Sequence, residues 1–263
     1  MVVTLPSGYT GQILHVNLTT GETSIEEINW EIAHKYVGGR GYAAKLLFDR
    51  LQPGISPISP DNLLVFATGP LTGTPAPASG RFSVSSKSPL TGTVFDANCG
   101  GTFGPEMKRA GFDLIVIEGK SEKPVYLWIS DGRAELKSAP HLMGKRTDET
   151  EEAIRKELKD EHVKVASIGP AGENSVRIAA IISDKHRAAG RGGLGAVMGS
   201  KNLKAVAVRG KKQIEVANPH AFKREVKQII EVLKRNPLTG DSLNRYGTGC
   251  LIHLINKAGI FPT

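Results

Sequence analysis

The chain has 263 residues, of which 40% are hydrophobic and 23% are charged, with 30 glycines and 15 prolines. This composition excludes a collagen-like repeat, a disordered tail and a membrane-spanning helix, because no apolar run is long enough to cross a bilayer. The length predicts one large domain, or a domain and a smaller one. Residues 1–30 lack the pattern of a secretory signal, so we expect a cytoplasmic protein.

The positive charge is concentrated in the second part of the chain. Residues 1–120 contain 9 basic and 10 acidic residues, whereas the whole chain carries a net charge of +8. Segment 185–212 has eight basic residues and no acidic one, which suits an anionic partner. These residues are Lys185, Arg187, Arg191, Lys201, Lys204, Arg209, Lys211 and Lys212. Nucleic acid is not expected, because no aromatic residue in the segment could stack on bases.

Strands dominate the first two hundred residues. Alternation of apolar and polar residues on both sides of a turn at 19–22 predicts a β-hairpin over 12–18 and 23–28. Helical spacing of leucines predicts a short helix over 41–51, which Pro53-Gly54 ends. Apolar runs predict further strands at 63–67, 114–117, 125–129, 163–168 and 203–208.

Two more helices are predicted from their end signals. Thr147 is the expected N-cap of a helix that ends near Lys159. Asn218-Pro219 begins a helix to Arg235, and the residues from there to 263 continue in a helical pattern. The elements together predict an α+β fold, followed by the start of a helical domain.

One series of motifs occurs twice. Gly69-Pro70 precedes Gly100-Gly101 and an apolar strand, and Gly169-Pro170 precedes Gly192-Gly193 and another apolar strand. The recurrence predicts a duplicated β-rich unit whose two glycine loops place two similar anionic groups around a pseudo-twofold axis. The alternative is a chance recurrence of Gly-Gly before a helix.

The strongest local signal for binding is segment 186–195, which is rich in glycine and arginine. Glycines let backbone N–H groups approach a phosphate, and Arg187 and Arg191 can each bind two oxygens. A plain turn with solvated charges is the alternative. The segment is not a Walker loop, because no Gly-Lys-Ser/Thr ends it. It does not follow a clear strand, which argues against dinucleotide binding.

A second candidate joins Arg81 to the segment 96–101. Arg81 could pair with an anionic oxygen, and Asn98 offers an amide side chain and a backbone carbonyl for a hard cation. The alternative is that both residues only cap loops. Cys99 is interpreted as a small buried residue. Neither Cys99 nor Cys250 belongs to a C-x-x-C motif. The seven histidines lack metal-ligand spacing, so none is a candidate ligand.

Several long motifs, in order, resemble the tungsten-containing aldehyde ferredoxin oxidoreductase family over nearly the whole chain. They are Gly69-Pro70-Leu71-Thr72-Gly73-Thr74, Ser79-Gly80-Arg81, Lys87-Ser88-Pro89-Leu90-Thr91-Gly92, Ile168-Gly169-Pro170-Ala171-Gly172-Glu173-Asn174, and His186 to Gly195 with Met198-Gly199-Ser200-Lys201-Asn202-Leu203-Lys204. The resemblance implies a cofactor-binding domain over 1–214, whose sheets form a base for tungsten, or molybdenum, held by two pyranopterins. Residues 215–263 would begin a helical second domain.

The resemblance also implies the roles of individual residues. The expected pterin contacts are Arg81, Asn98, Gly100, Arg187, Ala188, Ala189 and Gly190. Backbone carbonyls of Asn98 and Ala188 would hold a magnesium ion between two pterin phosphates. Two phosphates and one cation would account for the duplicated loops.

The resemblance further implies an oxidoreductase that converts aldehydes to carboxylic acids and passes electrons to ferredoxin. The [4Fe-4S] ligands of this family lie in helical domains that the sequence lacks. We therefore expect a fragment, a truncated reading frame or a subunit completed by another chain, and a homo-oligomer is compatible with it. No catalytic residue is assigned. The alternative function is a non-catalytic module that binds a phosphorylated ligand.

Overall fold

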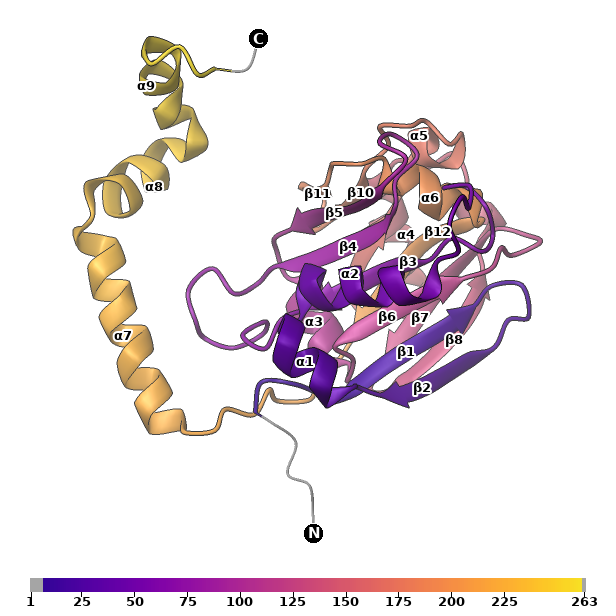
Figure 1. The fold of residues 1–263 in the computed structure, drawn as a ribbon, viewed down its shortest axis with the longest axis horizontal. Helices are drawn as coiled ribbons and strands as arrows, with labels where there is room; N and C mark the ends of the chain where they lie inside the picture. Colours follow the sequence, from indigo (N-terminus) through magenta and orange to yellow (C-terminus); the bar gives the residue numbers. More distant parts are fainter. Residues whose placement is uncertain (1–6, 262–263) are drawn as a thin grey trace. The chain divides into compact units, whose positions relative to one another are not determined.

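The computed structural model describes residues 7–261 and contains two six-stranded sheets (Figure 1). The first sheet has the order β2-β1-β6-β3-β4-β5. Its strands are β1 (Gln12–Asn17), β2 (Thr23–Glu27), β3 (Leu64–Thr68), β4 (Phe82–Lys87), β5 (Val94–Cys99) and β6 (Leu114–Glu118). The second sheet has the order β11-β10-β9-β12-β7-β8. Its strands are β7 (Val125–Ser130), β8 (Arg133–Ser138), β9 (Lys164–Ser167), β10 (Ile181–Ser183), β11 (Arg187–Ala189) and β12 (Leu203–Arg209).

Six helices and one 3-10 turn connect these strands. They are α1 (Trp30–Tyr36), α2 (Gly39–Arg50), α3 (Phe103–Arg109), η1 (Pro140–Leu142), α4 (Thr147–Leu158), α5 (Pro170–Glu173) and α6 (Leu194–Ser200). A run of helices follows, namely α7 (Pro219–Arg235), η2 (Leu238–Ser242), α8 (Leu243–Tyr246), η3 (Gly247–Leu251) and α9 (Ile252–Lys257). None of the helices within 7–261 is long and apolar enough to cross a membrane.

The two sheets have the same topology, which confirms the predicted duplication. Adding six to each strand number of the first sheet gives the order β8-β7-β12-β9-β10-β11. This is the order of the second sheet read from its other end. The directions agree too: β1 with β6 and β7 with β12 are the parallel pairs, and the remaining neighbours are antiparallel. We call residues 12–118 the first half and residues 125–209 the second half.

Three hydrophobic clusters form the core, and the largest of them joins the two halves. The largest cluster contains side chains from both sheets, such as Phe66 and Val206, and from α3 and α6, so it fills the space between the sheets. A second cluster lies between the first sheet and α1 and α2, and a third lies between the second sheet and α4. Successive residues of β6 alternate between the first two clusters, as a strand buried on both faces must.

The sequence patterns located the strands in apolar runs and three of the helices, and missed five strands that lack such runs. The hairpin, the strands in apolar runs, and helices α2, α4 and α7 form close to their predicted bounds. The strands β4, β5, β8, β10 and β11 were not predicted. The N-cap of α4 is Arg146 rather than Thr147, because the Glu149 carboxylate accepts a hydrogen bond of 2.8 Å from the Arg146 N–H.

The described residues form two compact units. One comprises 7–74 and 78–215 and contains both sheets. The other comprises 75–77 and 216–261, in which the helices from α7 to α9 lie. Asn218 caps α7 as expected, since its side chain accepts a hydrogen bond of 2.9 Å from the Ala221 N–H.

Candidate functional site

A cleft of about 650 Å³ lies where β5 of the first half meets β11 of the second. It brings together Arg81, Asn98, Ala188 and Gly190, four of the seven predicted contact residues, from segments up to about a hundred residues apart. We call it the β5–β11 cleft. Its other lining residues are Arg40, Phe95, Asp96, Ala97 and Arg191.

The cleft is rich in arginine whose charge is not used by the protein itself. Among residues 7–261, the guanidinium groups of Arg81 and Arg191 have no ion pair or hydrogen bond. The Arg40 side chain is 74% exposed and lies 3.9 Å from the Asp96 carboxylate. Free guanidinium groups at a concave site favour an anionic ligand with two oxygens to offer, such as a phosphate.

Two glycines, Gly190 in the cleft and Gly100 beside it, are not required by the packing of the described residues. A Cβ at Gly100 would have nothing within 4 Å, and a Cβ at Gly190 would touch only the Ala188 methyl group, at 3.5 Å. Neither glycine has a positive φ. The neighbouring Gly192 and Gly193 do have positive φ, and a side chain there would collide with Phe95 or with the Arg177 carbonyl. Gly100 and Gly190 therefore leave room beside the cleft that a ligand could use.

Asn98 and Ala188 occupy the same position in the two halves. Asn98 pairs with Ser83 across β4, and Ala188 pairs with Ile182 across β10. Ser83 and Ile182 are themselves equivalent, because they pair with Ala67 and Ser167, which each lie two residues before the recurring Gly-Pro. Both β5 and β11 are edge strands, so alternate backbone carbonyls have no strand partner. Carbonyl oxygens of this kind are ligands that a hard cation accepts.

The other three predicted residues, Gly100, Arg187 and Ala189, follow or adjoin lining residues in the sequence and do not line the cleft. The Ala189 side chain is fully buried in the cluster between the sheets, so only its backbone could reach a ligand. The Arg187 side chain is exposed and passes close to Gly101. Cys99 is buried as predicted, and burial raises the pKa of its thiol.

Sequence reasoning missed Arg40, and it gave no role to Asp96, although Asp96 lies in the candidate segment 96–101. Arg40 lies in the first turn of α2, within Gly38-Gly39-Arg40-Gly41. That run has the same composition as the arginine and glycine segment at 190–193, and this similarity was the signal that could have found it. Asp96 accepts a hydrogen bond of 2.9 Å from the Asn98 side-chain amide, so it restrains one predicted contact residue.

The segment 185–212 is not the continuous basic surface that its composition suggested. Lys201 and Lys204 are buried, and Lys204 forms an ion pair with Glu173. Arg209 pairs with Glu106 at 2.7 Å and with Asp160 at 2.9 Å, and Lys185 pairs with Glu152 at 2.6 Å. Acidic residues remote in sequence thus form ion pairs with three of the eight cations. Within 7–261, Arg187, Arg191, Lys211 and Lys212 have no ion pair, and buried Lys201 donates to two backbone carbonyls instead of a carboxylate.

One premise of the argument against dinucleotide binding was wrong. Gly190 does follow a strand, β11. However, β11 pairs only with β10, whereas β12, which follows α6, lies between β9 and β7. The two strands flanking α6 are therefore not the parallel neighbours of a dinucleotide-binding βαβ unit.

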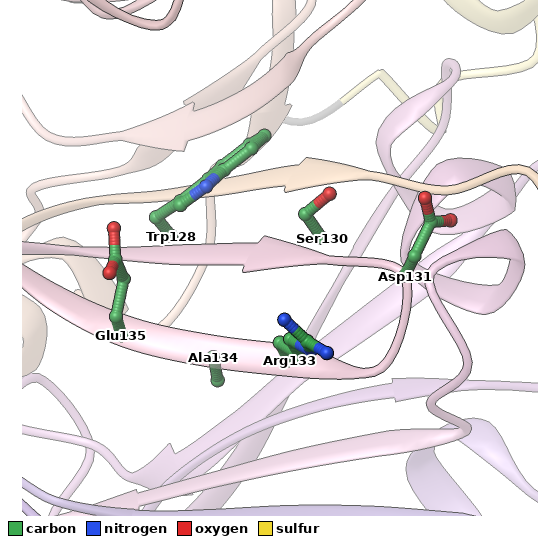
Figure 2. A pocket seen from close by; sticks show the side chains of 6 residues that line it. All are labelled: Trp128, Ser130, Asp131, Arg133, Ala134 and Glu135. Atoms are coloured by element: carbon green, nitrogen blue, oxygen red, sulfur yellow. The ribbon is translucent and has the colours of Figure 1, made fainter.

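A second hollow, of about 630 Å³, lies on the β7–β8 hairpin (Figure 2). Trp128 and Ser130 of β7 and Arg133 and Glu135 of β8 project from one face of the hairpin. The β1–β2 hairpin has a smaller hollow at the equivalent place, where His15 occupies the register position of Trp128. Because the hollow recurs with different side chains, we attribute it to the shape of the duplicated fold.

Comparisons with known proteins agree with this architecture. The family "Aldehyde ferredoxin oxidoreductase, N-terminal domain" matches residues 13–210. Tungsten-containing aldehyde ferredoxin oxidoreductases from Pyrococcus abyssi and Pyrococcus furiosus are 53% and 52% identical over 97% of this chain. The chain spans 42% of the length of either relative.

A solved structure shares the fold. The active site complex BamBC of benzoyl coenzyme A reductase, in complex with 1,5-dienoyl-CoA, matches with a TM-score of 0.86 and 43% identity. The match covers 88% of this chain and 35% of that one. The family match covers well over half of the residues and includes both sheets, with all four predicted residues that line the cleft. The chain therefore belongs to the aldehyde ferredoxin oxidoreductase family, whose N-terminal domain it contains.

Proposed function

We propose that residues 1–214 bind a tungsten bis-pyranopterin in the β5–β11 cleft, as part of an oxidoreductase that converts aldehydes to carboxylic acids. The observation that carries the proposal is that Asn98 and Ala188 occupy equivalent positions in the two halves and line one cleft. The same cleft contains two arginines, Arg81 and Arg191, without acidic partners within 7–261. A ligand with two phosphates and one bridging cation has the matching symmetry. The identity to tungsten-containing relatives supports the choice of metal.

The protein's own part in this function is to bind and orient. Arg81 and Arg191 would each hold a phosphate or pterin oxygen through paired N–H donors. Gly100 and Gly190 would let the ligand approach the backbone, since no side chain occupies that space. Carbonyls of Asn98 and Ala188 would bind magnesium between the phosphates. Arg187, and the backbone of Ala189 beside it, would complete the wall of the site.

The bound cofactor would supply the two-electron oxidation of the aldehyde, with water providing the second oxygen of the acid. The electrons would pass to a [4Fe-4S] cluster and then to ferredoxin, in the cytoplasm. A four-thiolate cluster cannot be built from the two cysteines of this chain. We therefore place its ligands in the part of the relatives that the chain does not span, or in a partner subunit.

The decisive experiment measures tungsten and pterin in the purified protein. The full chain is expressed in a host that makes tungstopterin, and metal content is determined by mass spectrometry and pterin by fluorescence after oxidative release. Two pterins and one tungsten per chain are expected. A folded protein that contains neither contradicts the proposal. The alternative of a phosphate-binding module without redox chemistry would show bound phosphate and no metal.

A further inference from the structure

Each half of the protein fixes the glycine loop of the other half. The turn between β10 and β11 carries Asp184, whose carboxylate accepts hydrogen bonds from both the backbone N–H and the hydroxyl of Thr102. Thr102 directly follows Gly100-Gly101 in the first half. In the opposite direction, the Ser88 hydroxyl follows β4 and donates a hydrogen bond of 2.6 Å to the Gly192 carbonyl. Gly192 lies in the glycine loop of the second half.

Backbone conformation restricts the first of these contacts, and burial restricts the second. Gly101 has a φ of +101°, and a Cβ there would collide with the Asp184 carboxylate. Asp184 itself adopts a positive φ of 47°, so its turn holds a conformation that ordinary residues seldom adopt. Ser88 is fully buried and also accepts hydrogen bonds of 3.1 Å from the Leu90 and Thr91 N–H groups. Strain and burial of this kind persist where the surrounding structure requires one position.

We propose that Asp184 and Ser88 are positioning residues, which together set the separation of the two glycine loops and hence the distance between Gly100 and Gly190 in the β5–β11 cleft. Neither residue lines the cleft. The inference rests on the proposed function for its ligand, a pterin-linked phosphate on each loop. Because a rigid ligand with two anionic groups needs both loops at one spacing, a loose loop would weaken binding even with every contact residue present.

The test compares Asp184→Ala with Asp131→Ala in the full chain. Asp131 is a matched control, because it also lies in a hairpin turn with a positive φ, of 45°, and accepts a backbone hydrogen bond of 2.9 Å, from the Lys211 N–H. It does not touch a glycine loop of the cleft. We expect Asp184→Ala to lose at least about tenfold in tungstopterin content, and Asp131→Ala to keep the content of the unaltered protein.

Hydrogen exchange of backbone amides supplies a second readout that needs no cofactor. In cofactor-free protein, Asp184→Ala should speed exchange at Thr102 by about tenfold, with amides in β6 and β12 unchanged. Ser88→Ala should loosen the loop at Gly192 in the same way. Thr102→Ser retains both donors to Asp184, so its exchange and cofactor content should equal those of the unaltered protein. Thr102→Val lacks the hydroxyl, so its values should lie between those of the unaltered protein and those of Asp184→Ala.

The outcomes separate this inference from the proposed function. If the unaltered protein binds no tungstopterin, the proposed function fails, and the exchange measurement alone then judges the two residues. If Asp184→Ala shows unchanged exchange at Thr102, or a normal cofactor content with a faster exchange, the positioning role is refuted. A global loss of protection in Asp184→Ala, matched by a lower melting temperature, would also refute it and assign the residue to stability alone.

Discussion

At the scale of single residues, the arginine side chains and the glycines at the β5–β11 cleft contribute in different ways. The arginines supply charge, and two of them, Arg81 and Arg191, have no acidic partner within 7–261, whereas Arg40 lies 3.9 Å from the Asp96 carboxylate. The glycines supply space, and only some of them are needed for folding. Substitutions can therefore separate the loss of a charge from the loss of space, which a site made only of charged side chains would not allow.

Replacing Arg81 with alanine should weaken retention of the cofactor. The change removes a charge-assisted, two-pronged contact of a kind that contributes about 1.5–3 kcal/mol, so tungsten and pterin content should fall by an order of magnitude or more. Arg133→Ala is the control, because Arg133 is an arginine without an ion pair within 7–261 and lies on the β7–β8 hairpin. Equal cofactor content in the two variants would remove Arg81 from the site.

Replacing Gly190 with valine should abolish cofactor incorporation without unfolding the protein. A side chain there meets only the Ala188 methyl group, and the backbone of Gly190 is not left-handed. It would fill the space assigned to the ligand and remove no charge. Lys212→Ala removes a charge outside the cleft and should leave incorporation nearly intact.

The comparison with Gly192→Val makes this prediction specific. That variant should fail to fold normally, because Gly192 has a φ of +73° and faces the Phe95 ring. Circular dichroism reports folding, and metal analysis reports incorporation. Normal cofactor content in a folded Gly190→Val protein would mean that backbone approach does not contribute to binding. A loss in Lys212→Ala as large as in Gly190→Val would instead indicate a diffuse electrostatic site.

At the scale of elements, the patterns that predicted the fold were those of strands buried on both faces. β3, β6 and β12 each contain four apolar residues in succession, and they were located closely. β4 reads Phe-Ser-Val-Ser-Ser-Lys, and its serines at 83 and 85 are buried although they are polar. A strand of this composition resembles a loop in sequence. β10 and β11 have three residues each, too few to show any period.

Sequence motifs predicted part of the cleft lining and missed what only the packing of remote elements brings there. Arg81, Asn98, Ala188 and Gly190 were found through motifs, and the duplication connected them. Arg40 was not found, because it reaches the cleft only through the packing of α2 over β4 and β5, and Asp96 of the candidate segment 96–101 was given no role. The basic character of 185–212 was overestimated because the partners of its lysines lie far away in sequence, as Glu173 does for Lys204.

A lysine that links elements of the two halves should make stability depend on pH. The Lys201 side chain follows α6, is fully buried and donates to the carbonyls of Pro60 and Gly119, at 2.9 and 3.0 Å. Burial lowers its pKa from 10.5 to about 8. Between those pH values, the unfolded chain binds a proton at Lys201 that the native chain does not. The free energy of unfolding should therefore rise with pH across this window.

The gain should reach about 3 kcal/mol near pH 10.5, at about 1.4 kcal/mol for each pKa unit. Lys201→Met removes the titrating group and keeps a long side chain. The quantity to measure is the difference in free energy of unfolding between the two proteins, from urea titrations at several pH values between 7 and 10.5. A difference that stays constant with pH would show that Lys201 titrates alike in both states.

At the scale of the whole molecule, the two-sheet unit should be stable without the helices that follow it. All members of the three hydrophobic clusters lie between Ile13 and Val208. In 216–261, Val226 is the one described hydrophobic residue that is buried. A chain that ends at Glu215 should therefore keep its melting temperature within about 2 °C in scanning calorimetry. A larger decrease would make 215–263 part of the same folding unit and contradict the proposed boundary.

The α7 helix has an apolar stripe that is largely exposed among the described residues. Ile229, Val232 and Leu233 are 47%, 67% and 38% exposed on it, in a helix of 17 residues. An apolar stripe of this kind is stable when a second element covers it. The relatives are more than twice as long as this chain, so they have the residues to do so.

The 263-residue chain by itself should not oxidise aldehydes with a viologen dye as electron acceptor. The proposed chemistry needs a path for electrons away from the cofactor, and this chain has two cysteines, of which Cys99 is buried beside Ser183 and Cys250 lies in η3. Four thiolates are required for a [4Fe-4S] cluster. The cofactor could still bind, so tungsten content and activity should separate in this chain.

The assay runs the purified chain beside the full-length enzyme from Pyrococcus furiosus, with the same aldehydes and dye. Dye reduction by the longer enzyme validates the conditions, and tungsten analysis of both samples shows whether the cofactor is present. A chain that contains tungsten and reduces no dye would support the view that this part of the protein binds the cofactor and depends on other residues for electron transfer. Turnover by the loaded chain would mean that electrons leave the cofactor directly to the dye, and that this domain alone contains the residues needed for the chemistry.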